Sequence, residues 1–136
     1  MSEPKSCFLC NLPPERIIDE CPLTVTIRDG FAVSPGHTLI VTKRHAPTYF
    51  DLTSEELAAV SAAIQKAKAG IDEAYQPDGF NIGINCGEWA GQSIPHLHVH
   101  LIPRYKGDVE DPKGGVRWVI PQRADYWSKQ TAESTQ

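Results

Sequence analysis

Three histidines alternate with apolar residues in one short stretch of the chain, which runs from His96 to Arg104. A period of two is typical of a β-strand with two chemically different faces. The apolar residues are therefore expected to point into a core, with a histidine row on the other face: His96, His98 and His100. Three of the chain's five histidines lie within five residues, so this stretch predicts a metal site or histidine-based chemistry.

The spacing of the row limits what it can bind. At roughly 3.3 Å per residue, the backbone positions of His96 and His100 are about 13 Å apart, whereas zinc binds nitrogen ligands at about 2.0–2.1 Å. Two neighbouring imidazoles can converge on one ion, but all three cannot easily do so. The row therefore predicts divided roles for its three histidines.

Two of the four cysteines form a Cys-x-x-Cys pair, Cys7 and Cys10, which is a common zinc half-site or redox motif. A redox pair normally opens a helix that follows a strand, and no strand is expected before Cys7. A zinc site needs two further ligands from elsewhere in the chain. Without them, the pair is simply two buried thiols.

Length and charge narrow the class of protein. The 136 residues are enough for one domain with a core. A formal net charge of −4 argues against a general nucleic-acid or membrane-surface binder, although a local pocket can still be positive. No apolar run approaches the roughly 20 residues that a membrane-spanning helix needs, and the start of the chain is polar. We therefore expect a cytoplasmic protein with neither a nucleic-acid nor a membrane partner.

Segments rich in β-branched residues, separated by turn residues, predict a sheet. Few residues connect the first three segments, so antiparallel pairing is more economical than crossover connections. Strands are expected over residues 16–20, 23–28, 37–43, 80–86, 96–104 and 116–120.

One long helix is expected between the third and fourth strands. Thr53 and Glu56 have the spacing of a capping box, in which each side chain bonds the other residue's backbone amide. Apolar residues then recur at spacings of three and four up to Tyr75, which places one apolar stripe against the sheet. We expect a single domain over residues 1–127, followed by a polar tail over residues 128–136.

Taken together, these residues resemble the histidine triad (HIT) family, whose signature is His-φ-His-φ-His-φ-φ with φ apolar. Residues 96–102 match every position of that signature, and the resemblance runs from Cys7 to about Trp127. It includes the segments 34–37, 43–45 and 91–93. The part from Ile102 to Trp118 is more similar to the fragile-histidine-triad hydrolases than to the phosphoramidases.

This resemblance implies an α+β fold, in which one long helix packs on a five-stranded antiparallel sheet, and a homodimer. It also implies transfer or hydrolysis of a nucleotidyl group at the α-phosphorus of dinucleoside polyphosphates or related nucleotide conjugates, without an organic cofactor. His98 matches the nucleophile, which would form a covalent nucleotidyl-histidine. An imidazole with a pKa near ~6.5 is largely neutral at cytoplasmic pH and keeps a lone pair for attack.

Other positions of the family's site carry over residue by residue. His37 matches a histidine that supports the triad from the neighbouring strand, and Asp29 matches the position that hydrogen-bonds the ribose hydroxyls. The residues that match positions around the phosphates are Asn85, Gln92, Ser93 and His100. The residues that lie where the family places its base pocket are Phe8, Leu9, Val25, Ile27 and Arg28.

Zinc-containing members of the family resemble this chain in a further set of residues. The set consists of Cys7, Cys10, His45 and His96. A closed group of two cysteines and two histidines suits structural rather than catalytic zinc. It would leave His98 and His100 for the substrate.

Three alternatives remain open at this point. A nucleoside phosphoramidase, which cleaves a P–N bond, would share the fold and the nucleophile. A zinc-dependent hydrolase would hold its ion on the histidine row, but the row has no acidic residue at ligand spacing. A nucleotide-binding module with little catalysis would keep the same pocket.

Overall fold

The computed structural model describes residues 5–128 and groups the chain into two compact units. The first unit extends to Tyr105 and the second begins at Lys106. The expectation of a single domain over residues 1–127 stays a prediction. Residues 129–136 of the expected tail lie outside the described residues.

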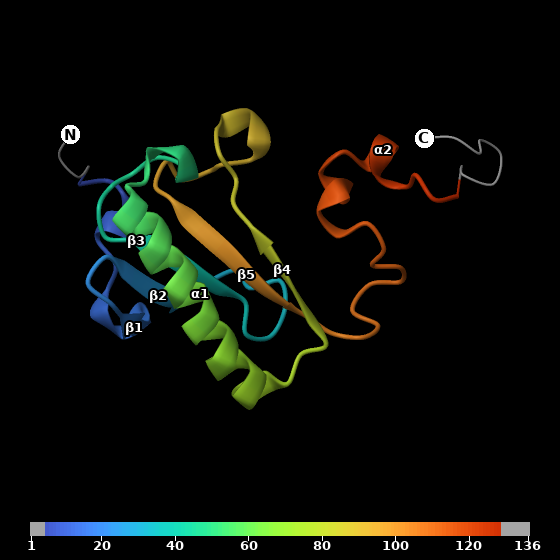
Figure 1. Cartoon of the computed structure of the whole chain (residues 1–136), viewed down its shortest axis with the longest axis horizontal. Helices are drawn as coiled ribbons and strands as arrows, with labels where there is room; N and C mark the ends of the chain where they lie inside the picture. The colour runs from blue at the N-terminus through green and yellow to red at the C-terminus, as the bar shows by residue number, and fades with distance from the viewer. Residues whose placement is uncertain (1–4, 129–136) are drawn as a thin grey trace. The chain divides into compact units, whose positions relative to one another are not determined.

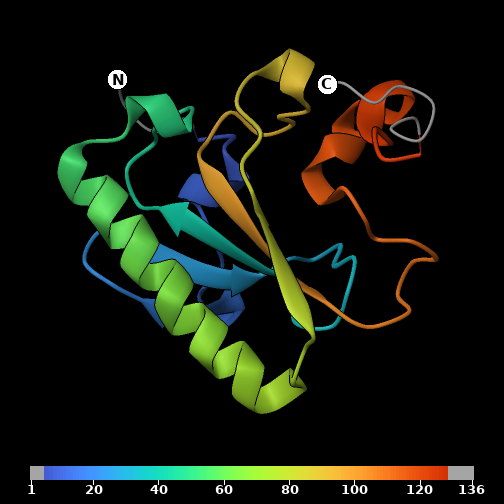
Figure 2. The same cartoon turned by 45° about the vertical axis from the view of Figure 1, so that its right-hand side comes forward.

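The first unit is built on a five-stranded antiparallel sheet with the strand order β1-β2-β3-β5-β4 (Figures 1 and 2). The last strand in sequence, β5, is thus inserted between β3 and β4. Together with the helix described below, this sheet confirms the expected α+β fold. The strands are β1 (Ile17–Glu20), β2 (Thr24–Arg28), β3 (Thr38–Thr42), β4 (Gly79–Gly83) and β5 (His98–Arg104).

All five strands are shorter than expected, and two of them lose more than one residue at one end. Strand β4 pairs with β5 only as far as the Gly83–His100 pair, three residues before the predicted end. Strand β5 begins at His98, because the backbone before it bonds to loops: the amide of His96 donates to the Ile94 carbonyl (2.8 Å) and that of Leu97 to the Ala46 carbonyl (2.7 Å). His96 therefore precedes the strand on which it was expected.

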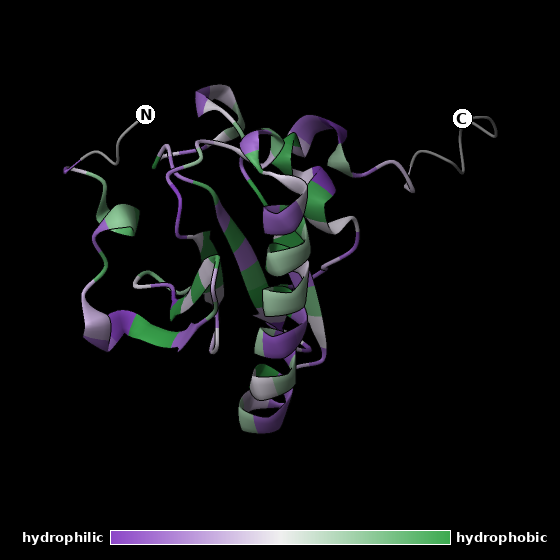
Figure 3. Ribbon diagram, turned by 60° about the vertical axis from the view of Figure 1, so that its left-hand side comes forward, coloured by the Kyte–Doolittle hydropathy of each residue, from purple (hydrophilic) through white to green (hydrophobic). Residues whose placement is uncertain are grey.

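The long helix α1 (Ser54–Tyr75) covers one face of the sheet, as both views show (Figures 1 and 2). Its capping box between Thr53 and Glu56 is present as predicted. Hydrophilic and hydrophobic segments alternate along α1 (Figure 3), as expected of an amphipathic helix. Its buried residues pack on the sheet in a core of Ile40, Val60, Ala63, Leu97 and Val99. No helix in the described part of the chain is both long and apolar enough to span a bilayer.

The opposite face of the sheet is partly covered by the N-terminal segment. This segment contains two short 3₁₀ helices, η1 (Phe8–Cys10) and η2 (Pro14–Arg16). It forms a second core with the sheet, made of Cys7, Leu9, Val25, Ile27, Leu39 and Val41. The same face carries His98 and His100, because Val41 pairs with His98 and Leu39 with His100 in the β3–β5 ladder.

The second unit contains the 3₁₀ helix η5 (Gly115–Val119) and the short helix α2 (Pro121–Ala124). The predicted strand over residues 116–120 is therefore wrong. Positive φ angles at Gly114 and Gly115 (98° and 50°) turn the backbone before the segment. The Arg117 side chain connects η5 to the end of α2 by donating from Nε to the Ala124 carbonyl oxygen (2.9 Å). A β-rich sequence forms a strand only where a neighbouring strand pairs with it.

Candidate active site

A cavity of about 480 Å³ opens on the histidine-bearing face of the first unit. Its polar lining comes from η2, β5, the loops beside β5 and the turn after β2: Arg16, Asp29, Asn85, Ser93, His98 and His100. Its apolar lining is drawn mainly from the N-terminal segment, β2 and β3: Phe8, Leu9, Ile27, Leu39 and Ile94. A volume of this size suits a small organic ligand with one polar and one apolar end.

The proton on His98 can be assigned from its hydrogen bond. Nδ1 of His98 lies 2.8 Å from the backbone carbonyl oxygen of His96. Because a carbonyl oxygen can only accept, Nδ1 must carry the proton and donate it. Nε2 of this cavity-lining ring then keeps its lone pair, which is the requirement for a nucleophile or a general base.

The protons on His37 and His100 follow from the same kind of reasoning. The backbone N–H of Val33 donates to Nδ1 of His37 (3.1 Å), so the His37 proton is on Nε2. That Nε2 lies 3.0 Å from Nδ1 of His100. His100 accepts at Nδ1 and therefore carries its own proton on Nε2. It offers the cavity a hydrogen-bond donor beside the lone pair of His98.

Burial favours the neutral form of both of these histidines. It lowers the pKa of His37, and the Asp29 carboxylate, whose Oδ2 lies 3.4 Å from His37 Nε2, only partly opposes this. Burial is also the main cause of the lowered pKa of His100, and the neighbouring rings of His98 and His37 lower it further. The relay from Val33 through His37 to His100 requires neutral rings, so the lowered pKa values are consistent with it.

Several of the residues predicted around the substrate do line the cavity: Phe8, Leu9, Ile27, Asp29, Asn85 and Ser93. His37 is buried and does not line the cavity, but its Nε2 contacts two residues that do, His100 and Asp29. Val25 packs in the core with the N-terminal segment. Leu39 and Ile94 were not singled out, although the period-two pattern of residues 37–43 would have placed Leu39 on the face of His37.

Two of the residues predicted around the substrate do not line the cavity. The amide nitrogen of Gln92 donates to the carbonyl oxygens of Pro47 (2.6 Å) and Ile94 (3.1 Å), and its oxygen accepts from the Gly87 amide (2.7 Å). Gln92 thus holds its own loop together, and it does not line the cavity.

Arg28 is the second of these residues. It follows Ile27 on β2, so its side chain points to the other face of the sheet. There, its Nη1 donates to Thr38 Oγ1 (2.8 Å), and its guanidinium lies 5.7 Å from the ring centroid of Tyr75 on α1. The arginine that does line the cavity is Arg16, which comes just before β1 and which no motif in the sequence marked.

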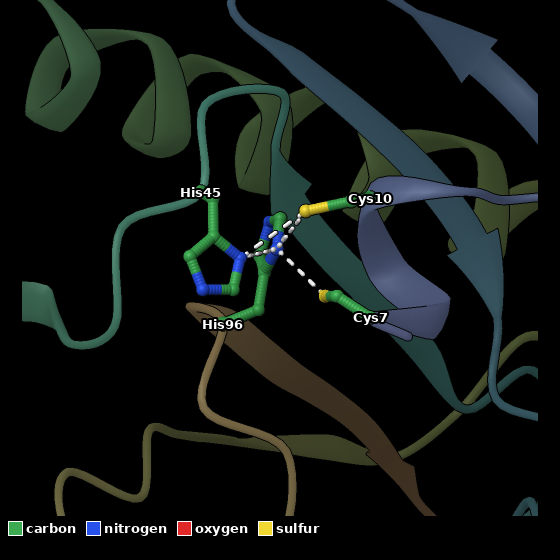
Figure 4. A group of neighbouring side chains, drawn as sticks. All are labelled: Cys7, Cys10, His45 and His96. Carbon is green, nitrogen blue, oxygen red and sulfur yellow. Dashed lines mark hydrogen bonds between the residues drawn. The ribbon is translucent and has the colours of Figure 1, made fainter. Parts of the chain in front are cut away.

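The four residues of the predicted metal set lie together in the structure (Figure 4). Nδ1 of His96 lies 3.4 Å from Cys7 Sγ, 3.3 Å from Cys10 Sγ and 3.1 Å from His45 Nδ1. These separations are close to the roughly 3.3–3.8 Å edges of a tetrahedral zinc site with nitrogen and sulfur ligands. The four residues form a cluster that can hold a metal ion.

The backbone behind His96 supports that reading. Nε2 of His96 lies 2.7 Å from the carbonyl oxygen of Thr42, so it carries the proton. Nδ1 keeps its lone pair and faces the two sulfurs and His45. A hydrogen bond from the non-ligating ring nitrogen to a carbonyl is the usual support of a metal-binding histidine.

A second group, Asp29, His37 and His100, also brings three possible ligand atoms within 4.8 Å of one another. The histidine row therefore does have an acidic neighbour in space, contrary to the expectation from its sequence spacing. However, the Val33 N–H places the His37 proton on Nε2, the nitrogen that would have to bind the ion. This group is therefore arranged for hydrogen bonding, which argues against a catalytic zinc on the row.

The fold and the site thus define a small α+β domain whose sheet carries a histidine-lined cavity on one face. The family model described as "HIT domain" matches residues 12–107. The chain belongs to this family.

Named relatives extend the comparison. Over 109 residues the chain is 39% identical to the Schizosaccharomyces pombe protein named bis(5'-nucleosyl)-tetraphosphatase (asymmetrical), covering 79% of this chain and 60% of that one. It is 40% identical over 103 residues to the AP-4-A phosphorylase of Mycobacterium tuberculosis, covering 74% of this chain and 52% of that one. The chain thus spans only about half to three fifths of these relatives. A HIT family protein from Bacillus anthracis has a similar structure, with a TM-score of 0.72, 27% identity and coverage of 97% and 99%.

Proposed function

We propose that this chain is a hydrolase of dinucleoside polyphosphates or related nucleotide conjugates, with His98 as the nucleophile at the α-phosphorus. The observation that carries the proposal is the bond from His98 Nδ1 to the His96 carbonyl, which leaves the Nε2 lone pair on a ring that lines the cavity. The two relatives named above are, by name, a tetraphosphatase and a phosphorylase of such compounds.

The proposed reaction has two steps. Nε2 of His98 forms a bond to the α-phosphorus while the bond from phosphorus to the leaving oxygen breaks, and water then hydrolyses the nucleotidyl-histidine. The ring becomes positively charged when Nε2 attacks, and the His96 carbonyl oxygen, 2.8 Å from Nδ1, stabilises that charge. Nε2–H of His100 donates to the phosphoryl or leaving oxygen as negative charge develops there.

The other polar residues of the cavity hold the substrate in this scheme. The Asp29 carboxylate accepts hydrogen bonds from the ribose hydroxyls, and its Oδ1 is already positioned by the Phe31 amide (2.8 Å). Asn85 and Ser93 supply donors for the phosphates, and His37 keeps His100 in the donating tautomer. Phe8, Leu9 and Ile27 form the apolar surface against which a base packs.

We further propose that the Cys7–Cys10–His45–His96 cluster binds a structural zinc ion. Support comes from the donor set, from its separations and from the Thr42 carbonyl behind His96. A bound ion would anchor His96, whose carbonyl orients the nucleophile. We also propose a cytoplasmic location. A homodimer remains part of the proposal, and light scattering of the purified protein tests it.

The decisive experiment offers the protein a dinucleoside tetraphosphate and a nucleoside phosphoramidate in parallel, and traps the intermediate by rapid acid quench for mass spectrometry. We expect faster turnover of the polyphosphate and a nucleotidyl adduct on the peptide that contains His98. A strong preference for the phosphoramidate would assign the chain to P–N hydrolysis instead. Binding of both compounds without turnover of either would leave a nucleotide-binding module.

A further inference from the structure

Arg16 is a cation on the wall of the cavity, and the proposed chemistry makes no use of it. Its Nη2 donates to the carbonyl oxygen of Arg28 (3.0 Å), and its guanidinium carbon lies 5.6 Å from the centroid of the Phe8 ring. On another side it meets the backbone of the turn after β2, because a Cβ added to Gly30 would lie 3.4 Å from Nη2. These contacts confine the guanidinium, so its donors have a defined direction.

The sheet places Arg16 away from the reacting histidines. His98 and His100 are on β5, Leu39 is on β3 and Ile27 is on β2, while Arg16 directly precedes the edge strand β1. With strands about 4.8 Å apart, β2 lies about 10 Å and β1 about 14 Å from β5. A nucleotide that presents its α-phosphorus to His98 extends its base across this distance, over the apolar residues and toward Arg16.

A guanidinium can only donate hydrogen bonds, and the Arg28 carbonyl takes one of its five N–H groups. Guanine presents two acceptors side by side, N7 and O6, whereas adenine presents N7 beside an amino group that donates. The first edge pairs with an arginine fork, while the second places donor against donor. An adenine in the same pose would therefore lose one hydrogen bond and leave an amino group facing a cation.

We infer that Arg16 is a specificity-determining residue that makes the pocket prefer 6-oxopurine nucleotides, such as those of guanine, over adenine nucleotides. The inference rests on the proposed function for the direction in which the nucleotide lies. A guanidinium that served only as a phosphate-attracting charge would strengthen the binding of all nucleotides equally. Selectivity between bases therefore separates the two roles of the same side chain.

The test is calorimetric titration of the full-length protein with GMP, IMP and AMP, which share the sugar and phosphate. IMP keeps N7 and O6 but lacks the amino group at position 2, so it isolates the edge assigned to Arg16. We expect GMP and IMP to bind roughly tenfold more tightly than AMP. In Arg16→Met, this ratio should fall close to one, mainly because GMP and IMP bind more weakly.

Two further variants are needed: one keeps the positive charge of Arg16 without its planar guanidinium, and the other is a control on the opposite face of the sheet. Arg16→Lys keeps the charge but not the planar fork, and should recover only part of the ratio. Arg28→Met removes the arginine on the other face of β2 and should leave the ratio unchanged. Because Arg16→Met removes contacts that confine the wall, a thermal melt of each variant accompanies the titrations, and Arg16→Lys carries the test if Arg16→Met unfolds.

Equal affinity of the wild-type protein for AMP and GMP would overturn the inference, as would equal weakening of all three ligands in the Arg16 variants. A failure of all three nucleotides to bind would overturn it as well. If the purine preference is found but dinucleoside polyphosphates stay intact, the hydrolase proposal fails and the role of Arg16 stands. If diadenosine and diguanosine substrates are hydrolysed at equal kcat/KM, the hydrolase proposal stands and the role of Arg16 in base selection fails.

Discussion

Two clusters of the first unit each contain two histidines: the metal cluster of Cys7, Cys10, His45 and His96, and the relay cluster of Asp29, His37 and His100. A backbone group behind one histidine of each cluster gives the two clusters different chemistry. The Thr42 carbonyl oxygen behind His96 accepts a hydrogen bond from Nε2–H, which leaves the Nδ1 lone pair facing two cysteines and a histidine. Behind His37 stands the Val33 amide, which occupies Nδ1 and leaves a proton on the nitrogen facing His100. The first arrangement suits a metal ion, and the second suits a hydrogen-bond relay.

The metal cluster is also connected to the proposed nucleophile by one hydrogen bond. His96 is fully buried, whereas His98 and His100 reach the cavity. The carbonyl oxygen of His96 accepts a hydrogen bond from Nδ1–H of His98, so whatever holds His96 also orients the nucleophile. The three histidines of one sequence motif thus have different roles: His96 supports the site, whereas His98 and His100 face the cavity. The group that hydrogen-bonds each ring sets its role.

The largest expected effect is the loss of hydrolysis when His98, on the cavity side, is replaced. His98→Ala should reduce hydrolysis by at least about 10⁴-fold, because it removes the nucleophile on which both steps depend. Nucleotide affinity, measured by titration, should change little, since the remaining cavity wall is intact. Full turnover in this variant would show that another residue forms the intermediate.

Zinc content should depend on the Cys7–Cys10–His45–His96 cluster and not on the cluster around His37. Cys10→Ser should drop zinc well below one equivalent per chain and lower the melting temperature by about 10 °C, because binding energy of a structural ion contributes to folding. Asp29→Asn, in the other cluster, should leave the zinc content unchanged, as measured by elemental analysis after chelator-free purification. Wild-type protein with far less than one equivalent of zinc would remove the structural-metal proposal.

A smaller effect is expected from the relay. His37→Ala should lower kcat about 10- to 100-fold with little change in KM, because His100 then loses the donor that holds its proton on Nε2. His37→Gln, whose amide N–H can also donate to His100, should recover part of the loss. Unaltered kcat in His37→Ala would show that the tautomer of His100 is set elsewhere.

The smallest effect concerns stability against pH. The pKa of His37 and of His100 is lowered from 6.5 by burial, so the unfolded chain binds more protons than the folded one just below that value. Stability should therefore be constant above about pH 6.5 with respect to these groups and decrease as the pH falls below it. Thermal melts from pH 8 to 5 measure this slope, which should be shallower in His37→Gln. An equal slope in the variant would exclude His37 as its source.

Most of the fold could be predicted from local sequence patterns. The capping box and the three-and-four spacing located α1 almost to the residue, because a cap and an amphipathic stripe are properties of consecutive residues. The expected strand over residues 116–120 was wrong because strand formation does not depend on consecutive residues alone. A strand needs a partner, and the backbone of this segment is turned by two glycines with positive φ.

The active-site strand could be predicted for the same local reason, and so could the membership of Cys7, Cys10, His45 and His96 in one cluster once the resemblance was recognised. The period of two on residues 98–104 by itself determined which side chains share a face, since successive residues of a strand point to opposite sides. It could not distinguish Arg28 from Arg16 as the arginine of the cavity, because Arg16 reaches it from a 3₁₀ helix outside the sheet.

The sequence by itself therefore determined the family, the helix, the sheet and the histidines that face the cavity. Only the tertiary structure decided which nitrogen of each ring carries its proton. That choice depends on a carbonyl at Thr42, an amide at Val33 and the carbonyl of His96, which folding brings against the rings from three different segments. The sequence specifies where an imidazole stands in the chain, and the backbone group that bonds its ring decides which nitrogen carries the proton and which keeps the lone pair.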